Sequence, residues 1–369
     1  ARVLPPPPPP PHQRRVEELW SYRFEPTDPR LRQHLLEEGF VVVRGAADAD
    51  ALRRLRAELW RYLEASTAMR RGRPETWSHF VGPAHLGLLT WGGIGQSTVM
   101  WEARTQPGVG AAFETAWGLP SGAPMLASFD GLALFRPPVL DASWQTQPAL
   151  EWLHVDQGAT KRGMAGVQGQ LLLWDQDGES GGLVCVPRSH LRHELLVGEH
   201  RRKDYVRFDA DDARLDGLGN ARLICAHAGD LVLWDSRTVH ASSPAAASAP
   251  LVRDEDGVPR PSRAVCMITM VPAAAHIRER PSLPRERVSL LEQACTTTHW
   301  PFETSVVSQG VAGSPGTLSD MRQLSPEARA LVLGEPCFRR QRYRTTQATA
   351  TAAATSAPGT PHVPLPGRC

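Results

Sequence analysis

Short apolar runs separated by glycine, proline and polar turns fill the chain from about residue 125 to residue 272. The clearest runs lie at 171–174, 183–186, 231–234 and 264–271. Each run has the length of a strand, and the turn signals between them are typical of an antiparallel sandwich or barrel. The pattern therefore predicts a mainly β core in this part of the chain.

The pattern before this region is different and predicts helices that flank the β core. A β-branched run at 39–45, ended by glycine, predicts a buried strand. Asp48 can cap the helix that follows, in which leucines at positions 52, 55, 59 and 63 form one apolar stripe. We expect helices between residues 20 and 120 to buttress one sheet.

Two later segments complete the predicted arrangement. Residues 318–333 have a helical pattern. Residues 241–257 are rich in Ala, Ser, Pro and charged side chains, so we expect a surface loop that carries no chemistry.

Composition divides the chain into three parts. Residues 1–17 form a proline-rich lead, expected to be extended and disordered, and residues 344–369 form a Thr/Ala/Pro-rich tail of the same kind. Residues 18–343 are long enough, in a chain that is 41% hydrophobic, to build one large domain.

Charge and cysteine content narrow the class of protein. The net charge is only +2, from 41 basic and 39 acidic residues, which argues against a nucleic-acid-binding surface. The chain has no apolar run long enough to span a membrane. The six cysteines form no CxxC pair or cluster, so a disulfide framework or thiolate zinc site is not expected. We predict an intracellular, cytoplasmic protein, with the organelle and the oligomeric state left open.

The candidate chemistry lies in His154-Val155-Asp156 and in His240, 86 residues after the first histidine. Residues two apart on a strand face the same way, so one strand can present His154 and Asp156 to a common point. Two imidazoles and one carboxylate leave half of a metal's coordination sphere open, as in non-haem Fe(II) oxygenases. We expect His154, Asp156 and His240 to be catalytic metal ligands.

The segments around these residues follow a characteristic order. The HxD pair lies in Trp-Leu-His-Val-Asp-Gln at 152–157, and a glycine pair at 181–182 leads through an apolar run into Pro-Arg-Ser-His at 187–190. Gly-Asp and an apolar run then precede Trp-Asp-Ser-Arg-Thr-Val-His at 234–240. In this order the chain resembles the phytanoyl-CoA dioxygenase family of Fe(II)/2-oxoglutarate oxygenases.

The resemblance is expected to extend from residue 39 to about residue 334. Three shorter stretches, at 93–96, 101–104 and 128–131, also resemble one branch of this family. One departure is Arg188, where the family usually has glycine, and it affects the expected geometry of the turn rather than the metal site.

The family resemblance implies a double-stranded β-helix, also called a jelly roll or cupin-like fold. It further implies that Fe(II) and 2-oxoglutarate are used with dioxygen to oxidise a substrate, releasing succinate and CO2. Halogenating relatives replace the carboxylate ligand with a small residue, and this chain keeps Asp156, which favours hydroxylation. We expect a small-molecule or lipid-like substrate, and the family name does not identify it.

The resemblance also implies an arginine that binds the distal carboxylate of 2-oxoglutarate, for which a planar guanidinium is well suited. Arg253, Arg260 and Arg263 are the candidates. We prefer Arg263, because it alone adjoins a predicted strand, where its side chain can be held rigidly.

Further pocket residues and rival functions complete the predictions. Gln96, Trp101, Arg104 and Gln157 are candidates for the pocket wall, and His190 could line the site without binding metal. A zinc-dependent hydrolase would use the same three ligands. A non-catalytic metal-binding jelly roll or a protein hydroxylase would also fit this ligand set.

Overall fold

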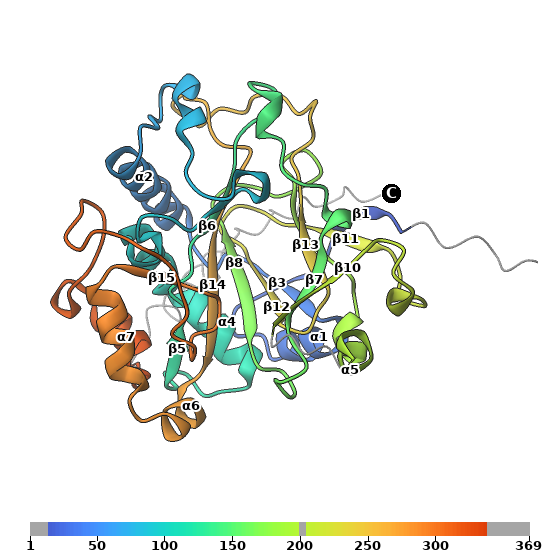
Figure 1. Cartoon of the computed structure of the whole chain (residues 1–369), viewed down its shortest axis with the longest axis vertical. Helices are drawn as coiled ribbons and strands as arrows, with labels where there is room; N and C mark the ends of the chain where they lie inside the picture. Colours follow the sequence, from blue (N-terminus) through green and yellow to red (C-terminus); the bar gives the residue numbers. More distant parts are fainter. Residues whose placement is uncertain (1–13, 199–203, 338–369) are drawn as a thin grey trace, which may run out of the picture.

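The computed structural model describes residues 14–198 and 204–337 (Figure 1). The predicted tail and most of the predicted lead lie outside these residues. Val16 and Glu17, however, belong to the first strand, β1 (Val16–Trp20), which pairs in parallel with β11 (Ala221–Cys225). The folded part therefore begins before residue 18, because a strand partner about 200 residues away in the sequence orders the end of the lead.

Two sheets face one another across the centre of the molecule. The smaller has the strand order β1-β11-β9-β13-β7-β10, and the larger has the order β2-β3-β12-β8-β14-β6-β4, with β5 beside β14. The remaining strand bounds in the smaller sheet are β7 (Leu153–Gln157), β9 (Gly182–Cys185), β10 (Asp204–Phe208) and β13 (His240–Ser243). Those in the larger sheet are β2 (Arg23–Phe24), β3 (Phe40–Val43), β4 (Leu88–Leu89), β5 (Met125–Ala127), β6 (Leu132–Phe135), β8 (Val167–Leu172), β12 (Leu231–Asp235) and β14 (Arg263–Pro272). A separate pair is formed by β15 (Cys295–Thr297) and β16 (Val306–Gln309).

The chain path between these sheets identifies the fold. From β6 onward, the strands alternate between the two sheets: β6, β8, β12 and β14 lie in the larger sheet, and β7, β9 and β13 lie in the smaller. The alternation is interrupted once, because β10 and β11 follow β9 in the smaller sheet. This alternation is the winding of a double-stranded β-helix. The predicted mainly β class with flanking helices is confirmed.

Helices cover the outer face of the larger sheet (Figure 1), except for α5 (His193–Val197), which packs into the apolar cluster of the smaller sheet. The helices are α1 (Arg30–Glu38), α2 (Ala49–Ser66), α3 (Thr98–Arg104), α4 (Pro107–Trp117), α5 (His193–Val197), α6 (Ala273–Glu279), α7 (Leu283–Glu292) and α8 (Pro326–Leu333). Asp48 caps α2 by accepting a hydrogen bond from the Ala51 amide at 2.8 Å, and the four leucines of the predicted stripe are buried. The expected buttress of helices is therefore present.

The larger sheet is buried on both faces, which explains its long apolar runs. In β3, Val41 and Val43 pack beneath the helices, while Phe40 and Val42 face the smaller sheet. Burying each such side chain contributes about 1.5–3 kcal/mol to folding. A strand covered on both sides does not show the polar alternation of a half-exposed strand.

Three element boundaries differ from the predicted ones. β8 begins at Val167, well before the predicted run at 171–174, because its first half carries the polar pair Gln168 and Gln170. β13 includes three residues of the predicted 241–257 loop. Within the predicted helix at 318–333, α8 begins only at Pro326, since Ser325 caps it and proline is favoured in a first turn. No helix in the described ranges is both long and apolar enough to cross a membrane.

Candidate functional site

The three predicted metal ligands meet at the inner face of the smaller sheet. In β7, Leu153 and Val155 point into an outer apolar cluster, so the alternation of the strand turns His154 and Asp156 inward. β13 pairs with β7 in a register that places His240 directly opposite His154. Two neighbouring strands therefore bring the three side chains together.

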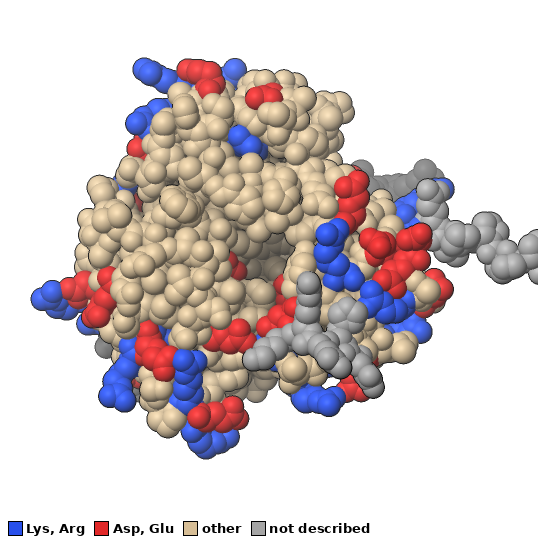
Figure 2. Space-filling model, in the orientation of Figure 1, with Lys and Arg blue, Asp and Glu red and all other residues tan. Residues whose placement is uncertain are grey.

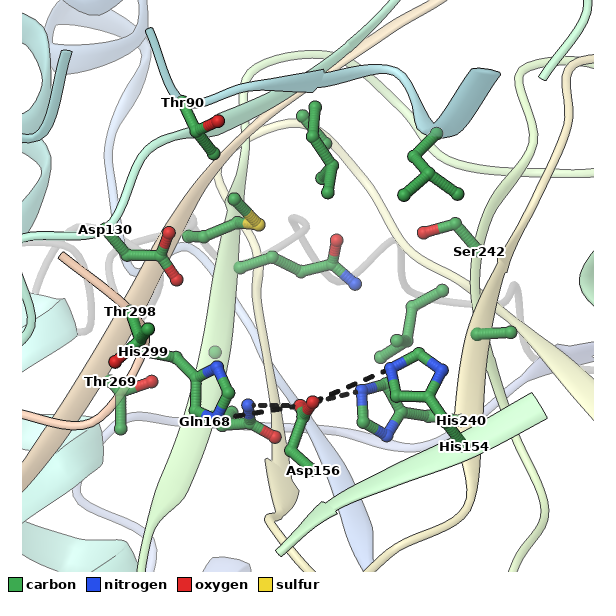
Figure 3. Close-up of a pocket in the computed structure, with 18 of the residues that line it drawn as sticks. Thr90, Asp130, His154, Asp156, Gln168, His240, Ser242, Thr269, Thr298 and His299 are labelled. Atoms are coloured by element: carbon green, nitrogen blue, oxygen red, sulfur yellow. Dashed lines mark hydrogen bonds and ion pairs between the residues drawn. The ribbon is translucent and has the colours of Figure 1, made fainter. Parts of the chain in front are cut away.

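The ligand atoms are close enough to share one ion (Figure 3). Nε2 of His240 lies 3.3 Å from Oδ2 of Asp156, and Nε2 of His154 lies 3.7 Å from Oδ1. One potential ligand atom from each of the three residues lies within 4.8 Å of the others. All three side chains are at most 12% exposed.

Backbone carbonyl groups set the tautomer of both histidines. Nδ1 of His154 lies 2.8 Å from the Trp152 carbonyl oxygen, and Nδ1 of His240 lies 2.9 Å from that of Thr238. A carbonyl oxygen can only accept, so each Nδ1 carries the hydrogen and donates it. The lone pair of each Nε2 is thereby directed toward Asp156, as metal-binding histidines require.

Burial and neighbouring imidazoles set the protonation states at the site. Burial, reinforced by the nearby His240, lowers the pKa of His154 to about 4. Burial alone would raise the pKa of Asp156, but His299, His240 and His154 together hold that pKa well below its usual value. At neutral pH the site therefore presents a neutral imidazole at His154 and an ionised carboxylate, the forms that bind metal.

Two side chains contact Asp156 that the sequence analysis did not select. Gln168 of β8 donates a hydrogen bond from Nε2 to Oδ2 of Asp156 at 2.7 Å. His299, just after β15, places Nε2 4.0 Å from the same oxygen, and this nitrogen is buried without a hydrogen-bond partner among the described residues. Gln168 was missed because the strand was predicted from an apolar run that begins only at residue 171. His299 was missed because its segment has little regular pattern.

Arg263 begins β14 and is 2% exposed. Its guanidinium donates to two glutamine oxygens, from Nε to Gln176 at 2.9 Å and from Nη2 to Gln170. Nη1 is buried and has no hydrogen-bond partner among the described residues. Burial lowers the pKa of Arg263 to about 9, which still leaves the guanidinium charged at neutral pH. Arg263 is therefore a buried cation with a free donor, and no described carboxylate forms an ion pair with it.

The two rival arginines lie elsewhere. Arg253 is exposed and donates to the Gly257 carbonyl oxygen. Arg260 stacks on Trp174, with 5.6 Å from its guanidinium carbon to the ring centre. Neither contributes to the cavity that contains the three ligands.

One cavity of about 430 Å³ joins Arg263 to the metal ligands. It lies between the two sheets, and the space-filling view is hollowed near the middle of this face, with acidic atoms visible there (Figure 2). Trp152, Trp234 and Leu183 contribute to its walls. Tyr205 of β10 also lines it, with its ring centre 4.8 Å from that of His154. A largely apolar enclosure of this size suits a small organic ligand.

The four candidate wall residues do not line this cavity. Gln96 donates to the Cys295 carbonyl oxygen and accepts from Trp101 Nε1, so both side chains are tied together behind the wall. Gln157 accepts from Ser236 Oγ and from the amide of Ala165, which fixes the loop after β7. The polar groups of Gln96, Trp101 and Gln157 form hydrogen bonds with other groups of the protein. These residues therefore support the structure around the cavity and do not face a ligand.

Arg104 and His190 also lie outside the cavity lining. Arg104 is buried and donates to the backbone carbonyl oxygens of Gly95 at 2.7 Å and Asp130 at 2.9 Å. His190 places Nε2 3.0 Å from the Leu36 carbonyl oxygen, which ties its turn to α1. Arg104 thus holds the backbone of a residue that does face the cavity, Asp130.

Replacing Arg104 by methionine is expected to destabilise the fold by about 3 kcal/mol, because two carbonyl groups lose their charged donor in a buried place. Chemical denaturation measures this change. The matched control, Arg54→Met, removes an exposed arginine paired with Glu102 and should change the unfolding free energy by less than about 1 kcal/mol. Equal stability of Arg104→Met and the parent protein would contradict the supporting role.

Comparison with known proteins gives one curated relative and several solved structures. The relative is Ava biosynthesis cluster protein O from Aspergillus versicolor, which is 32% identical over 163 residues, covering 41% of this chain and 50% of the relative. The chain thus matches about half the length of that protein.

The solved structures share low sequence identity with the chain. AviO1 from Streptomyces viridochromogenes Tue57 is 16% identical, with a TM-score of 0.42 over 67% of this chain and 96% of that one. The non-heme alpha ketoglutarate dependent carbocyclase SnoK from nogalamycin biosynthesis is 18% identical, with a TM-score of 0.43 over 68% and 87%. EctD from S. alaskensis with bound Fe is 15% identical, with a TM-score of 0.42 over 69% and 80%.

The family comparison identifies the central part of the chain. Residues 135–250 match the model of the family described as phytanoyl-CoA dioxygenase (PhyH). This range is narrower than the expected 39–334, but it runs from the end of β6 past β13 and so contains His154, Asp156 and His240. The resemblance found in the sequence is confirmed for residues 135–250, which are similar to the phytanoyl-CoA dioxygenase family.

Proposed function

We propose that this protein is an Fe(II)- and 2-oxoglutarate-dependent oxygenase that hydroxylates a small molecule. The observation that carries the proposal is the pairing, in one cavity, of a two-histidine, one-carboxylate cluster with the buried and incompletely paired guanidinium of Arg263. A metal site alone fits many enzymes. A metal site that shares an enclosure with a buried cation fits a chelating dicarboxylate as co-substrate.

The residues present fit both groups. His154, Asp156 and His240 would hold the metal, since they offer two nitrogen donors and one charged oxygen and cover one side of the ion. Gln168 would keep Asp156 oriented through its hydrogen bond, as residues behind metal ligands commonly do. The free Nη1 of Arg263 would donate to the distal carboxylate of 2-oxoglutarate.

The bound metal and co-substrate would supply activation of dioxygen, with 2-oxoglutarate converted to succinate and CO2 and a substrate C–H bond oxidised. The protein's own part is positioning and exclusion of water. Trp152 stacks on His154 with 5.2 Å between ring centres, and Trp234 lies 5.4 Å from His240. These rings keep the ligands in place and cover them with apolar surface, which limits side reactions with water.

A zinc-dependent hydrolase is the main alternative, since zinc accepts the same ligands. Such an enzyme would need an activated water but would have no use for Arg263. A buried guanidinium without a carboxylate partner is costly to retain, so a function that uses it is favoured.

Anaerobic titration with Fe(II) and then 2-oxoglutarate tests the proposal. We expect a weak visible charge-transfer band from the chelate, followed by slow release of succinate when oxygen is admitted. Saturation with Zn(II) in place of Fe(II) is the control and should give neither signal. Tight Zn(II) binding without a band in the presence of Fe(II) and 2-oxoglutarate would instead support the hydrolase or the non-catalytic jelly roll.

A further inference from the structure

The cavity contains a second carboxylate, Asp130, that the proposed chemistry does not use. Asp130 lies in the short segment between β5 and β6 and lines the cavity together with Thr298 and His299. Figure 3 shows these three side chains on the wall opposite His240. The polar groups on this wall therefore face the space left for a substrate.

Asp130 is held rigidly and faces the cavity with an unused oxygen. Its backbone carbonyl oxygen accepts from the buried Arg104, and the next residue, Gly131, accepts from the amide of Met267 in β14. Oδ1 accepts from the Gly131 amide at 2.7 Å, whereas Oδ2 accepts no hydrogen bond from any residue that the structure describes. Burial raises the pKa of Asp130, with partial compensation from His299 and Arg104. A carboxylate this enclosed is stabilised by a donor that the ligand brings.

The other charges of the cavity limit what can enter. Arg263 is the only lysine or arginine among the described residues that line it. Once Arg263 binds the co-substrate and the metal neutralises Asp156, no free lysine or arginine remains in this lining to meet a substrate carboxylate or phosphate. An anionic group on this wall would be repelled by Asp130, and His299 and Thr298 would be the donors left there to offset its lost hydration.

We infer that the substrate is a mainly apolar molecule that carries no anionic group into the cavity and donates a hydrogen bond, from an amino or hydroxyl group, to Asp130. This inference rests on the proposed function, because it assigns Arg263 to the co-substrate. It makes Asp130 a residue that determines specificity, and it places the substrate between the apolar walls with its donor group on the side away from His240.

Binding of three naphthalene derivatives tests the inference, because their rings suit the apolar walls and a cavity of about 430 Å³. They carry an aminomethyl, a hydroxymethyl or a carboxylate group. Calorimetry is performed on the protein loaded with Zn(II) and 2-oxoglutarate, which binds ligands without turnover. We expect the aminomethyl and hydroxymethyl probes to bind the parent protein at least about tenfold more tightly than the carboxylate probe.

Asp130→Asn is the informative variant, because the amide oxygen can still accept from the Gly131 amide and the fold should be kept. Removal of the charge should weaken binding of the aminomethyl probe by more than about tenfold and change the affinity for the hydroxymethyl probe by less than about threefold. Asp130→Ser, which shortens the side chain, should weaken both probes. Thermal melting of the variants confirms that they are folded.

A second arm separates this inference from the proposed function. In metal-free protein, the aminomethyl probe is compared between Asp130→Asn and Asp156→Asn, since both carboxylates then face the cavity. Weaker binding of the aminomethyl probe to Asp130→Asn than to the parent protein supports the inference even if Zn(II) and 2-oxoglutarate fail to bind. The inference would be overturned by a loss of aminomethyl-probe binding confined to Asp156→Asn or by failure of the donor probes to bind the parent protein. Equal binding of the carboxylate probe to the parent protein loaded with Zn(II) and 2-oxoglutarate would also overturn it.

Discussion

Replacing His240 by alanine is expected to abolish Fe(II) binding and succinate formation while leaving the fold intact. Changes to residues behind a metal ligand already cost about 10–100-fold in affinity, so loss of one of three ligands should cost at least ~100-fold. The strand should survive, because β13 is held by backbone pairing with β9 and β7 and alanine is tolerated there. Competition with Mn(II), followed by electron paramagnetic resonance, measures the affinity directly.

The matched control for this variant is His227→Ala. His227 is a half-exposed histidine that packs on Trp20, with 5.2 Å between ring centres, and it does not line the cavity. Metal affinity of His227→Ala should equal that of the parent protein. If His240→Ala keeps its metal, His299 becomes the candidate third ligand, because its Nε2 lies 4.0 Å from Asp156. His299→Ala would then lose the metal, whereas the present assignment predicts that it keeps it.

The clustering of the three predicted ligands could be expected from the sequence because the signal is local. Two residues of one strand, His154 and Asp156, must share a face whatever the rest of the fold does. His240 follows a glycine turn and a strand, β12, that is apolar up to its last residue, Asp235. Strand alternation and the order of segments are properties of the chain itself, so the fold class and the clustering of these three side chains were predictable together.

The other residues around the cavity were not predictable in this way. His299 reaches the cavity from a segment with no regular pattern, and Asp130 reaches it from the recognised stretch 128–131, in which it was not selected as a pocket residue. Only the pairing of β6 with β14, and a backbone hydrogen bond from β15 to the segment before β6, place them there. The stretches containing Gln96, Trp101 and Arg104 were recognisable, but a recognisable motif can reflect packing as readily as ligand contact. In this fold these three side chains hold the backbone behind the cavity wall.

Arg263→Ala is expected to raise the concentration of 2-oxoglutarate needed for half-saturation by more than ~100-fold while Fe(II) remains bound. A charge-assisted pair between guanidinium and carboxylate contributes about 3 kcal/mol, and each 1.4 kcal/mol corresponds to about a factor of ten in affinity. The metal ligands lie on the opposite sheet from Arg263, so Fe(II) affinity should not change. Anaerobic titration of the visible band with 2-oxoglutarate gives the half-saturation point.

Two further variants make this result specific to Arg263. Arg263→Lys keeps the charge and most of the volume but loses the planar pair of donors. Its half-saturation concentration of 2-oxoglutarate should therefore lie between those of the parent protein and Arg263→Ala. Arg260→Ala removes an arginine that stacks on Trp174 and should leave the requirement unchanged. In the opposite pattern, the requirement for 2-oxoglutarate would be unchanged in Arg263→Ala and raised in Arg260→Ala or Arg253→Ala. That result would assign the co-substrate carboxylate to an arginine outside the cavity. The buried Nη1 of Arg263 would then need another anion as its partner, and the inferred neutral or cationic substrate would lose its basis, because Arg263 would be free to bind a substrate carboxylate.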